Sequence, residues 1–217
     1  MRRFAALILT SVCAASAVQA QETRLFQNSW FWGVHAGSTS LGTASGGTGH
    51  AATIGGDWMI TRTTGGIYAS YDQANFTRTG QVTDVSGSSG VRNVRIHDMR
   101  TASIAGVAFP KQFGNFRPYA GLGLSIAVIG DATPLADPVT QAGQTSVTVS
   151  SDVQQRIDDA RSHAGVFLIG GGQWQLRKVA VFGQISLAPS SDEFLLTNAV
   201  NNISVGVRYN FGSSIDK

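Results

Sequence analysis

Residues 203–211, with the sequence ISVGVRYNF, alternate without a break between apolar residues and small or polar ones. Because successive side chains of a β-strand point to opposite faces, one face here is apolar and ends in Tyr209 and Phe211. The opposite face carries Ser204, Gly206, Arg208 and Asn210. This pattern is typical of a strand that spans a membrane in a β-barrel, with lipid outside, a polar lumen inside and aromatic rings at the headgroup level.

The same stretch resembles the C-terminal signal of outer-membrane proteins, which the barrel-assembly machinery reads as polar, any, Gly, apolar, any, aromatic, any, aromatic. The matching positions are Ser204, Gly206, Val207, Tyr209 and Phe211. In that family the last aromatic residue usually ends the chain, whereas here residues 212–217 follow it. The resemblance implies insertion into a bacterial outer membrane, with the barrel-assembly machinery as a partner during biogenesis.

The beginning of the chain predicts a secretory signal peptide over residues 1–20. Arg2 and Arg3 precede an apolar stretch over residues 4–15, and Val18 and Ala20 suit the −3 and −1 positions of a cleavage site. The apolar run is shorter than the roughly 18 residues that a membrane-spanning helix needs. The one cysteine lies inside this segment, so the mature chain is expected to be exported and to contain no disulfide.

The mature chain carries little net charge. Without the two arginines of the signal, 16 − 2 = 14 basic residues face 13 acidic ones, a net charge of +1. No basic patch indicates a nucleic-acid partner. No apolar run after the signal is long enough to form a spanning helix, and a membrane protein without such helices must be a closed barrel because every backbone group has to be satisfied in lipid.

Eight strand patterns follow one another along the mature chain, over residues 30–41, 50–61, 65–73, 94–109, 118–130, 158–176, 179–188 and 199–211. The segments between them alternate between long and short, as in outer-membrane barrels with short periplasmic turns and longer extracellular loops. The long ones, at 42–49, 74–93, 131–157 and 189–197, are rich in Gly, Ser, Thr and Asn. We therefore expect an all-β, eight-stranded antiparallel up-and-down transmembrane β-barrel over residues 30–211. A periplasmic segment at 21–29 and a short periplasmic tail at 212–217 would flank it.

The fifth pattern adds a second resemblance. Residues 117–125, RPYAGLGLS, are similar to the fifth strand of small outer-membrane barrels of the OmpA membrane-domain and OmpX-like family, also described as porin-family barrels. The resemblance extends in outline over residues 30–211. It implies the same barrel architecture and a place in the outer membrane, with outer-membrane lipid as a partner.

Aromatic residues cluster beside the predicted short turns and the chain ends. They are Trp30, Trp32, Trp58, Phe109, Tyr119, Trp174, Tyr209 and Phe211. An interfacial girdle has this arrangement because amphipathic rings favour the headgroup region. The rival fold is a soluble, secreted barrel of the lipocalin or avidin kind, whose apolar face points inward onto a ligand. Alternation alone does not distinguish inside from outside, although the girdle and the C-terminal pattern favour a membrane.

The polar faces of the strands predict a charged lumen, formed by His35, Asp57, Arg100, Arg161, His163, Gln184 and Arg208. An eight-stranded barrel has room inside only for side chains, and a charge buried there must be paired. We therefore expect Asp57 to neutralise one or more of the arginines. The alternative is a narrow polar conduit that opens when such a pair breaks.

The sequence offers no catalytic, cofactor or metal site. The candidate pairs Ser162–His163 and His97–Asp98 are adjacent in strands, where neighbours point to opposite faces, so neither forms a nucleophile–base contact without a bulge. No Cys and His spacing suits a metal. A structural or surface-interaction role, with an extracellular ligand bound at the long loops, is therefore the first expectation. A narrow channel is the second, and a lipid-modifying enzyme is the third.

Overall fold

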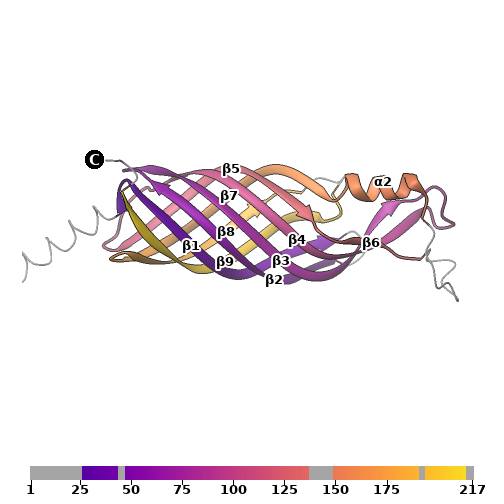
Figure 1. Ribbon diagram of the computed structural model, residues 1–217, viewed down its shortest axis with the longest axis horizontal. Coiled ribbons are helices and arrows are strands. Elements are labelled where there is room, and N and C mark those ends of the chain that lie inside the picture. Colours follow the sequence, from indigo (N-terminus) through magenta and orange to yellow (C-terminus); the bar gives the residue numbers. More distant parts are fainter. Residues whose placement is uncertain (1–25, 44–46, 137–148, 191–193, 214–217) are drawn as a thin grey trace, which may run out of the picture.

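In the computed structural model, the chain forms a closed, elongated β-barrel (Figure 1). The structure describes residues 26–43, 47–136, 149–190 and 194–213. Its elements are β1 (Ser29–Thr43), β2 (Gly47–Thr61), β3 (Gly65–Thr83), β4 (Val91–Ala108), β5 (Phe116–Ile129), β6 (Ala132–Pro134), α2 (Ser151–Asp159), β7 (Ser162–Leu176), β8 (Val179–Ala188) and β9 (Thr197–Ser213). Nine strands form one sheet, but the short β6 only pairs with β4 beyond the end of β5, so eight strands make the barrel.

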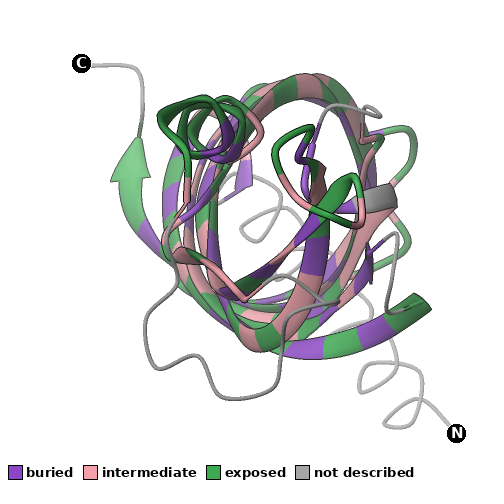
Figure 2. Cartoon of the chain, turned by 90° about the vertical axis from the view of Figure 1, so that its right-hand side faces the viewer, coloured by how far each residue is buried: buried purple, intermediate pink, exposed green. Residues whose placement is uncertain are grey.

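Each barrel strand pairs antiparallel with the next barrel strand along the chain, and β9 closes the barrel on β1. The view along the axis shows this ring, with buried and exposed residues alternating along each strand (Figure 2). The predicted fold class is therefore confirmed. We call the end that holds residues 26 and 213 and the short turns the terminal end, and the opposite end the distal end.

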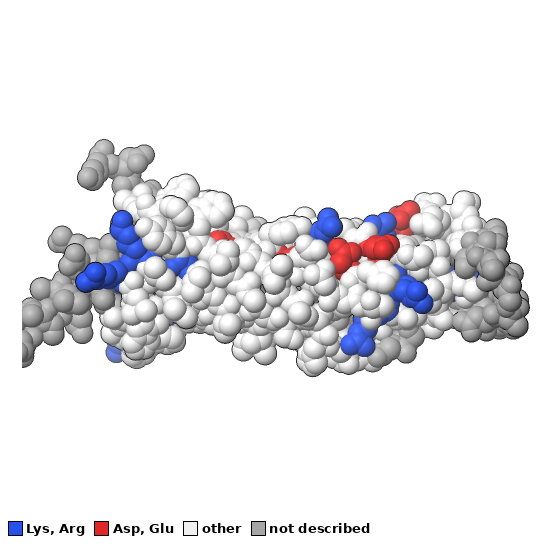
Figure 3. All heavy atoms as spheres, turned by 60° about the horizontal axis from the view of Figure 1, so that its bottom comes forward, with Lys and Arg blue, Asp and Glu red and all other residues white. Residues whose placement is uncertain are grey.

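The outer face of the barrel is apolar. Exposed side chains on it include Val34, Ile54, Leu124, Val205 and Val207. Figure 3 shows few charged side chains along the middle of the barrel, between a basic group at the terminal end and a mixed group toward the distal end. A belt of apolar side chains facing outward is what a bilayer requires, and it excludes the soluble barrel with an inward apolar face.

Residues 74–93 were predicted to be a long loop, and this prediction is wrong. β3 continues to Thr83 and β4 begins at Val91, so only a turn separates them. The pairing passes an irregularity between Asn75 and Arg78, beyond which β3 pairs with β4 but not with β2. The polar composition misled the prediction because this part of the hairpin extends past the barrel and has no lipid-facing side.

The predicted loop at residues 131–157 contains β6 and most of α2, and the strand predicted from residue 158 begins at Ser162. The Ser150 side chain caps the helix by accepting from the backbone N–H of Val153. Val153 and Ile157 form its buried side and pack against Val94 of β4. Among the described residues, no helix has the length and apolar character needed to cross a membrane.

Candidate functional site

The centre of the lumen is an ion pair between Asp57 of β2 and Arg208 of β9, on either side of Gly33 in β1. Arg208 Nε donates to Asp57 Oδ1 at 2.5 Å, and both side chains are fully buried. A Cβ on Gly33 would lie 2.7 Å from Arg208 Cγ and 2.8 Å from Asp57 Oδ2. Glycine is therefore the residue that lets the two charged side chains meet across β1.

The remaining donors of Arg208 are also satisfied. Nη1 donates to Gln173 Oε1 and Nη2 to Gln184 Oε1, each at 3.1 Å. The guanidinium carbon lies 3.7 Å from the centre of the Phe182 ring, a cation–π contact. Tyr119 donates to Gln184 Oε1 at 2.9 Å. The buried cation is thus paired and hydrogen-bonded on all sides, as its burial requires.

His35 of β1 extends this network. Its Nδ1 lies 3.3 Å from Asp57 Oδ2, and its Nε2 lies 2.6 Å from Asp72 Oδ1 on β3. Asp57 therefore serves both His35 and Arg208. The result is a continuous chain of ionisable groups, Asp72–His35–Asp57–Arg208, across the middle of the lumen.

Apolar side chains close the lumen on both sides of this network. At the terminal end, Phe26 lies before β1 and packs against Phe31 and Phe109, with ring centres 5.8 and 4.9 Å away. The guanidinium carbon of Arg117 lies 4.0 Å from the Phe26 ring centre. At the distal end, the buried residues 194–196 join a second cluster with Leu41, Ala51, Ala74, Ile96, Met99, Ala127 and Ile129. Within the described residues the lumen is filled rather than open.

Of the predicted lumen residues, the structure places His35, Asp57, Gln184 and Arg208 in this network. The placement of Arg100 in the lumen is wrong, because its side chain lies on the outer face, 55% exposed, and pairs with Asp98 at 3.4 Å. Both faces of β4 contain apolar residues, because Met99 and Val107 turn inward whereas Ile104 faces outward.

Arg161 and His163 lie at the distal end, away from the network. Arg161 precedes β7, donates to the backbone carbonyls of Ile129 and Gly130 and pairs with Asp158 at 3.3 Å. Of the three predicted arginines, Arg208 is therefore the one that Asp57 neutralises. His163 Nε2 faces the carbonyl of Pro189 at 3.1 Å. Parity places a residue on a face but does not say how far along the barrel axis it lies.

The network also contains Tyr68, Asp72, Tyr119 and Gln173, which the predicted set of lumen residues did not include. Asp72 and Tyr68 are on the inward face of β3 in the sequence pattern, and that parity was the available signal. Tyr119 shares its face with Gly121 and Gly123, the small-residue side of β5, which marks it as inward.

Two residues of the predicted aromatic girdle, Phe109 and Tyr119, do not face lipid. Phe109 and Tyr119 are buried inside the barrel, because a rim of large inward rings fills its terminal end. The other six lie on the outer face near the terminal end: Trp30, Trp32, Trp58, Trp174, Tyr209 and Phe211. The rings of Trp30 and Trp58 are 5.3 Å apart. Phe113 and Phe116, in and beside the turn before β5, are exposed and join this rim.

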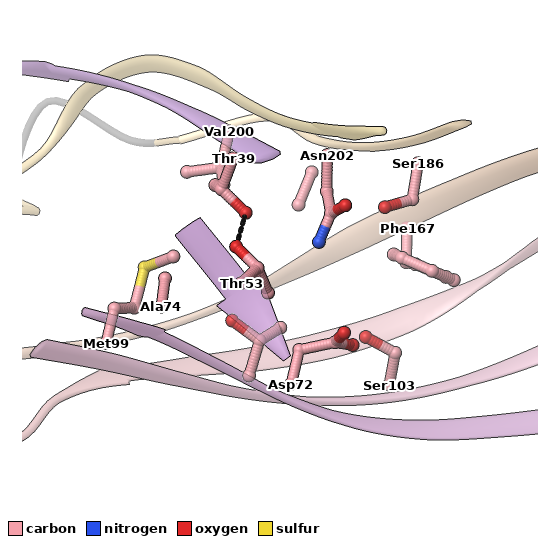
Figure 4. A pocket seen from close by; sticks show the side chains of 12 residues that line it. Thr39, Thr53, Asp72, Ala74, Met99, Ser103, Phe167, Ser186, Val200 and Asn202 are labelled. Carbon is pink, nitrogen blue, oxygen red and sulfur yellow. Dashed lines mark hydrogen bonds between the residues drawn. The ribbon is translucent and has the colours of Figure 1, made fainter. Parts of the chain in front are cut away.

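A small cavity separates the network from the distal cluster (Figure 4). Its volume is about 30 Å³. Its lining combines apolar side chains with hydroxyl, amide and carboxylate groups, including Asp72 of the network. Thr39 and Thr53 share a hydrogen bond of 2.5 Å on one side of it.

The distal parts of β3 and β4, with β6 and α2, form a head beyond the barrel (Figure 1). At its tip, Asp84 Oδ1 accepts from the backbone and hydroxyl of Ser86, at 3.0 and 2.6 Å. Arg92 binds Asp84 Oδ2 at 2.8 Å and donates to the carbonyl of Leu135. The hydrogen bonds from Ser86, together with those from Arg92, lower the pKa of the Asp84 carboxyl. Beside the tip, Val85 is 78% exposed.

A groove of about 490 Å³ runs along the head between β3 and α2. It is lined by Gln81, Val82, Thr83, Arg156, Asp159, Ala160, Phe194 and Leu195. Its wall is therefore mixed, with apolar side chains beside hydroxyl and amide groups and with one basic and one acidic side chain, Arg156 and Asp159.

The two sequence pairs considered for catalysis have other contacts. His97 Nδ1 lies 3.2 Å from the Thr77 hydroxyl, and its neighbour Asp98 pairs with Arg100. The ring of His163 packs against Phe194, with centres 5.6 Å apart. Among the described residues, no group of three or more His, Cys, Asp or Glu side chains could hold a metal ion.

No protein-family model matches the chain, and no curated protein matches its sequence. Similar solved structures are the attachment invasion locus protein Ail of Yersinia pestis, the Neisserial surface protein A and the N-terminal β-barrel domain of Pseudomonas aeruginosa OprF. Their TM-scores are 0.50, 0.52 and 0.50, with sequence identities of 10%, 10% and 13%. The alignments cover 85%, 84% and 85% of this chain and 99%, 97% and 98% of the other. The chain thus has the fold of the small, OmpA- and OmpX-like outer-membrane β-barrels.

Proposed function

We propose that this chain is an outer-membrane surface protein whose barrel anchors a rigid head outside the cell, where the head contacts an extracellular partner. The apolar outer face and the aromatic rim suit a lipid anchor. Bacterial barrels keep both termini in the periplasm, so the distal head would face outward. Two of the similar structures carry compatible names, one an attachment protein and the other a surface protein.

The observation that carries this proposal is that the head has regular secondary structure and a hydrogen-bonded turn. Instead of a loose loop, it has a long hairpin whose turn is fixed by Asp84 and Arg92. α2 covers one side of the hairpin through Val153 and Ile157. A surface that is ordered before binding loses less conformational entropy when a partner docks, which favours specific contact.

The same proposal includes two partners for the barrel itself. Lipid would cover the outward apolar side chains. The barrel-assembly machinery would read the last strand, in which Val207, Tyr209 and Phe211 all point outward. The filled lumen supports the anchoring role over a narrow channel, because conduction would require both apolar clusters to move.

The test is adherence of cells that display the full chain. A Gram-negative host lacking the protein expresses it with its signal, and attachment to cultured epithelial cells and immobilised matrix proteins is counted. Two head variants, Val85→Glu at the tip and Thr83→Lys in the groove, alter exposed side chains. Lys111→Ala, at the terminal end, is the control.

We expect display of the chain to increase attachment, the head variants to reduce it and the control to leave it unchanged. All four proteins must reach the membrane in equal amounts, measured by the gel shift of the unboiled barrel. No gain over the empty host on any surface would contradict the proposal. Attachment at the wild-type level by both head variants would contradict the proposal that the head contacts the partner.

A further inference from the structure

The turns at the terminal end of the barrel carry a group of exposed cations, which we call the basic edge. It consists of Arg62 between β2 and β3, Lys111 between β4 and β5, and Arg177 and Lys178 between β7 and β8. None of these three turns contains an Asp or a Glu. In the part of the chain that the structure describes, Lys111, Arg177 and Lys178 form no ion pair. Figure 3 shows basic side chains gathered at this end, whereas both signs of charge mix toward the distal end.

The basic edge adjoins the aromatic rim. Lys111 Nζ lies 5.7 Å from the ring centre of Phe113, which is exposed at the same end. Trp174, also exposed, lies three residues before Arg177 on β7. Because aromatic rings on the outside of a barrel lie at the headgroup level, cations in the turns just beyond them lie near the lipid phosphates. Long basic side chains at this depth place their charge among the headgroups while their stems follow apolar surface.

A polar pocket of about 280 Å³ lies beside the turn between β7 and β8. Lys178 lines it, together with residues from the start of β1 and the end of β9: Gln27, Asn28, Ser29, Asn210, Gly212 and Ser213. The backbone N–H of Asn210 donates to the carbonyl of Lys178 at 2.7 Å, so the turn is held against β9. The lining therefore combines one cation with amide and hydroxyl groups and contains no carboxylate. Such a set suits a phosphate ester that also carries hydroxyl groups.

The backbone of Arg177 gives an independent reason to assign a role to this turn. Its φ of 58° lies in the left-handed region, where glycine and asparagine are the usual residues. The turn has only two residues between Leu176 and Val179, and arginine adopts this conformation at an energetic cost. A contact between the guanidinium and an anion outside the chain would offset that cost.

We propose that the basic edge binds anionic phospholipids of the membrane leaflet next to the terminal end, with Arg177, Lys178 and the adjoining pocket as the main headgroup site. The lipid phosphate would pair with the two cations, and headgroup hydroxyls would bond to the amide and hydroxyl groups of the pocket. Phosphatidylglycerol offers both features. Phosphatidylethanolamine carries its own cation, which would face the basic edge, and is therefore disfavoured. The position beside the aromatic rim favours lipid over the glycan of the cell wall. This site lies at the opposite end from the head and does not depend on what the head contacts.

The test counts the lipids that stay bound to the folded barrel. The full chain is refolded into nanodiscs with equal amounts of phosphatidylglycerol and phosphatidylethanolamine, and native mass spectrometry identifies the lipids that each barrel retains. The test variant is Arg177→Asn/Lys178→Gln, in which asparagine suits the positive φ and so preserves the turn. The matched control, Arg95→Gln/Arg156→Gln, removes two exposed cations from the head. The gel shift of the unboiled barrel confirms that all three proteins are folded.

We expect the wild type to retain phosphatidylglycerol in several-fold excess over phosphatidylethanolamine, and high salt to reduce this preference. The test variant should lose roughly fivefold or more of the preference, because each cation near an anionic surface contributes about that factor. The control should match the wild type. Equal retention of the two lipids by the wild type would overturn the proposal, as would a preference that the test variant keeps or that the control also loses.

Sedimentation of the same proteins with insoluble peptidoglycan distinguishes the cell wall from lipid as the partner. We expect no difference between the wild type and the test variant. Sedimentation that the test variant loses, combined with unchanged lipid retention, would assign the basic edge to the cell wall and overturn the proposal.

Discussion

Replacing Asp57 by alanine is expected to lower the free energy of unfolding of the barrel by about 3–5 kcal/mol. The side chain of Asp57 accepts from Arg208 at 2.5 Å and faces His35 at 3.3 Å, and all three are buried. Its removal leaves the guanidinium in the lumen without its counter-charge, and the cost of an unpaired buried charge sets the magnitude. Asp57→Asn keeps one acceptor but loses the charge, so its loss should be smaller.

The measurement is urea unfolding of barrels refolded in lipid vesicles, with the folded fraction read from the band of the unboiled barrel on a gel. The matched control is Asp98→Ala, which breaks the partly exposed pair with Arg100 and should cost about 0–1 kcal/mol. The double variant Asp57→Ala/Arg208→Met removes both charges and should recover much of the stability. A loss for Asp57→Ala no larger than that for Asp98→Ala would refute a structural role for the network.

Three further predictions follow from single residues. Gly33→Ala should destabilise the barrel clearly more than Gly56→Ala in the same urea assay. The new Cβ at position 33 would lie 2.7 Å from Arg208, whereas at position 56 the nearest atom is 3.5 Å away. Equal losses of stability would contradict the conclusion that Asp57 and Arg208 meet over Gly33. Phe26→Ala should cost about 3–5 kcal/mol and increase ion leakage in planar bilayers, because it empties the centre of the terminal cluster; unchanged stability would mean that the segment does not seal the barrel. The Asp84 carboxyl has a lowered pKa when folded, so its stabilisation of the tip is present above the unfolded pKa of about 3.9 and is lost as pH falls through the folded value. Limited proteolysis with an acid-active protease should show the wild-type tip opening only below about pH 4. In a separate digestion at neutral pH, with a protease that is active there, the Asp84→Ala tip should be cleaved readily and the wild-type tip should resist; equal cleavage of the two at neutral pH would show that the clamp does not hold the tip.

The barrel was predictable because lipid imposes a simple rule on its strands. In β9, every outward-facing residue from Ile203 to Phe211 is apolar. The alternation therefore predicts both the presence of the strand and which of its two faces contacts lipid. β8 matches its predicted range, Val179–Ala188, because the turn before it is short and its pattern is clear. The pairing of Asp57 with Arg208 followed from the expectation that buried charges are paired.

The failures occur where that rule does not operate. In β4 both faces are partly apolar, so parity placed Arg100 inside although it lies outside beside Asp98. Phe109 and Tyr119 are aromatic residues near the rim, but they fill the terminal end instead of facing lipid. The head could not be recognised from the sequence because a hairpin exposed to water is polar on both faces, and its composition resembles that of a loop. Residues 1–20 and 214–217, to which the signal peptide and most of the short tail were assigned, lie outside the described residues.

The central claim is that the apolar face of this barrel contacts lipid, and the tryptophans test it most directly. All four lie on the outer face near the terminal end: Trp30, Trp32, Trp58 and Trp174. The barrel is refolded into vesicles of lipids brominated at defined depths, and tryptophan fluorescence is compared with that in unbrominated vesicles. Strong quenching by bromine near the headgroups, with little quenching by aqueous acrylamide, is the predicted result. Fluorescence that bromine leaves unchanged and acrylamide quenches would contradict a membrane-spanning barrel.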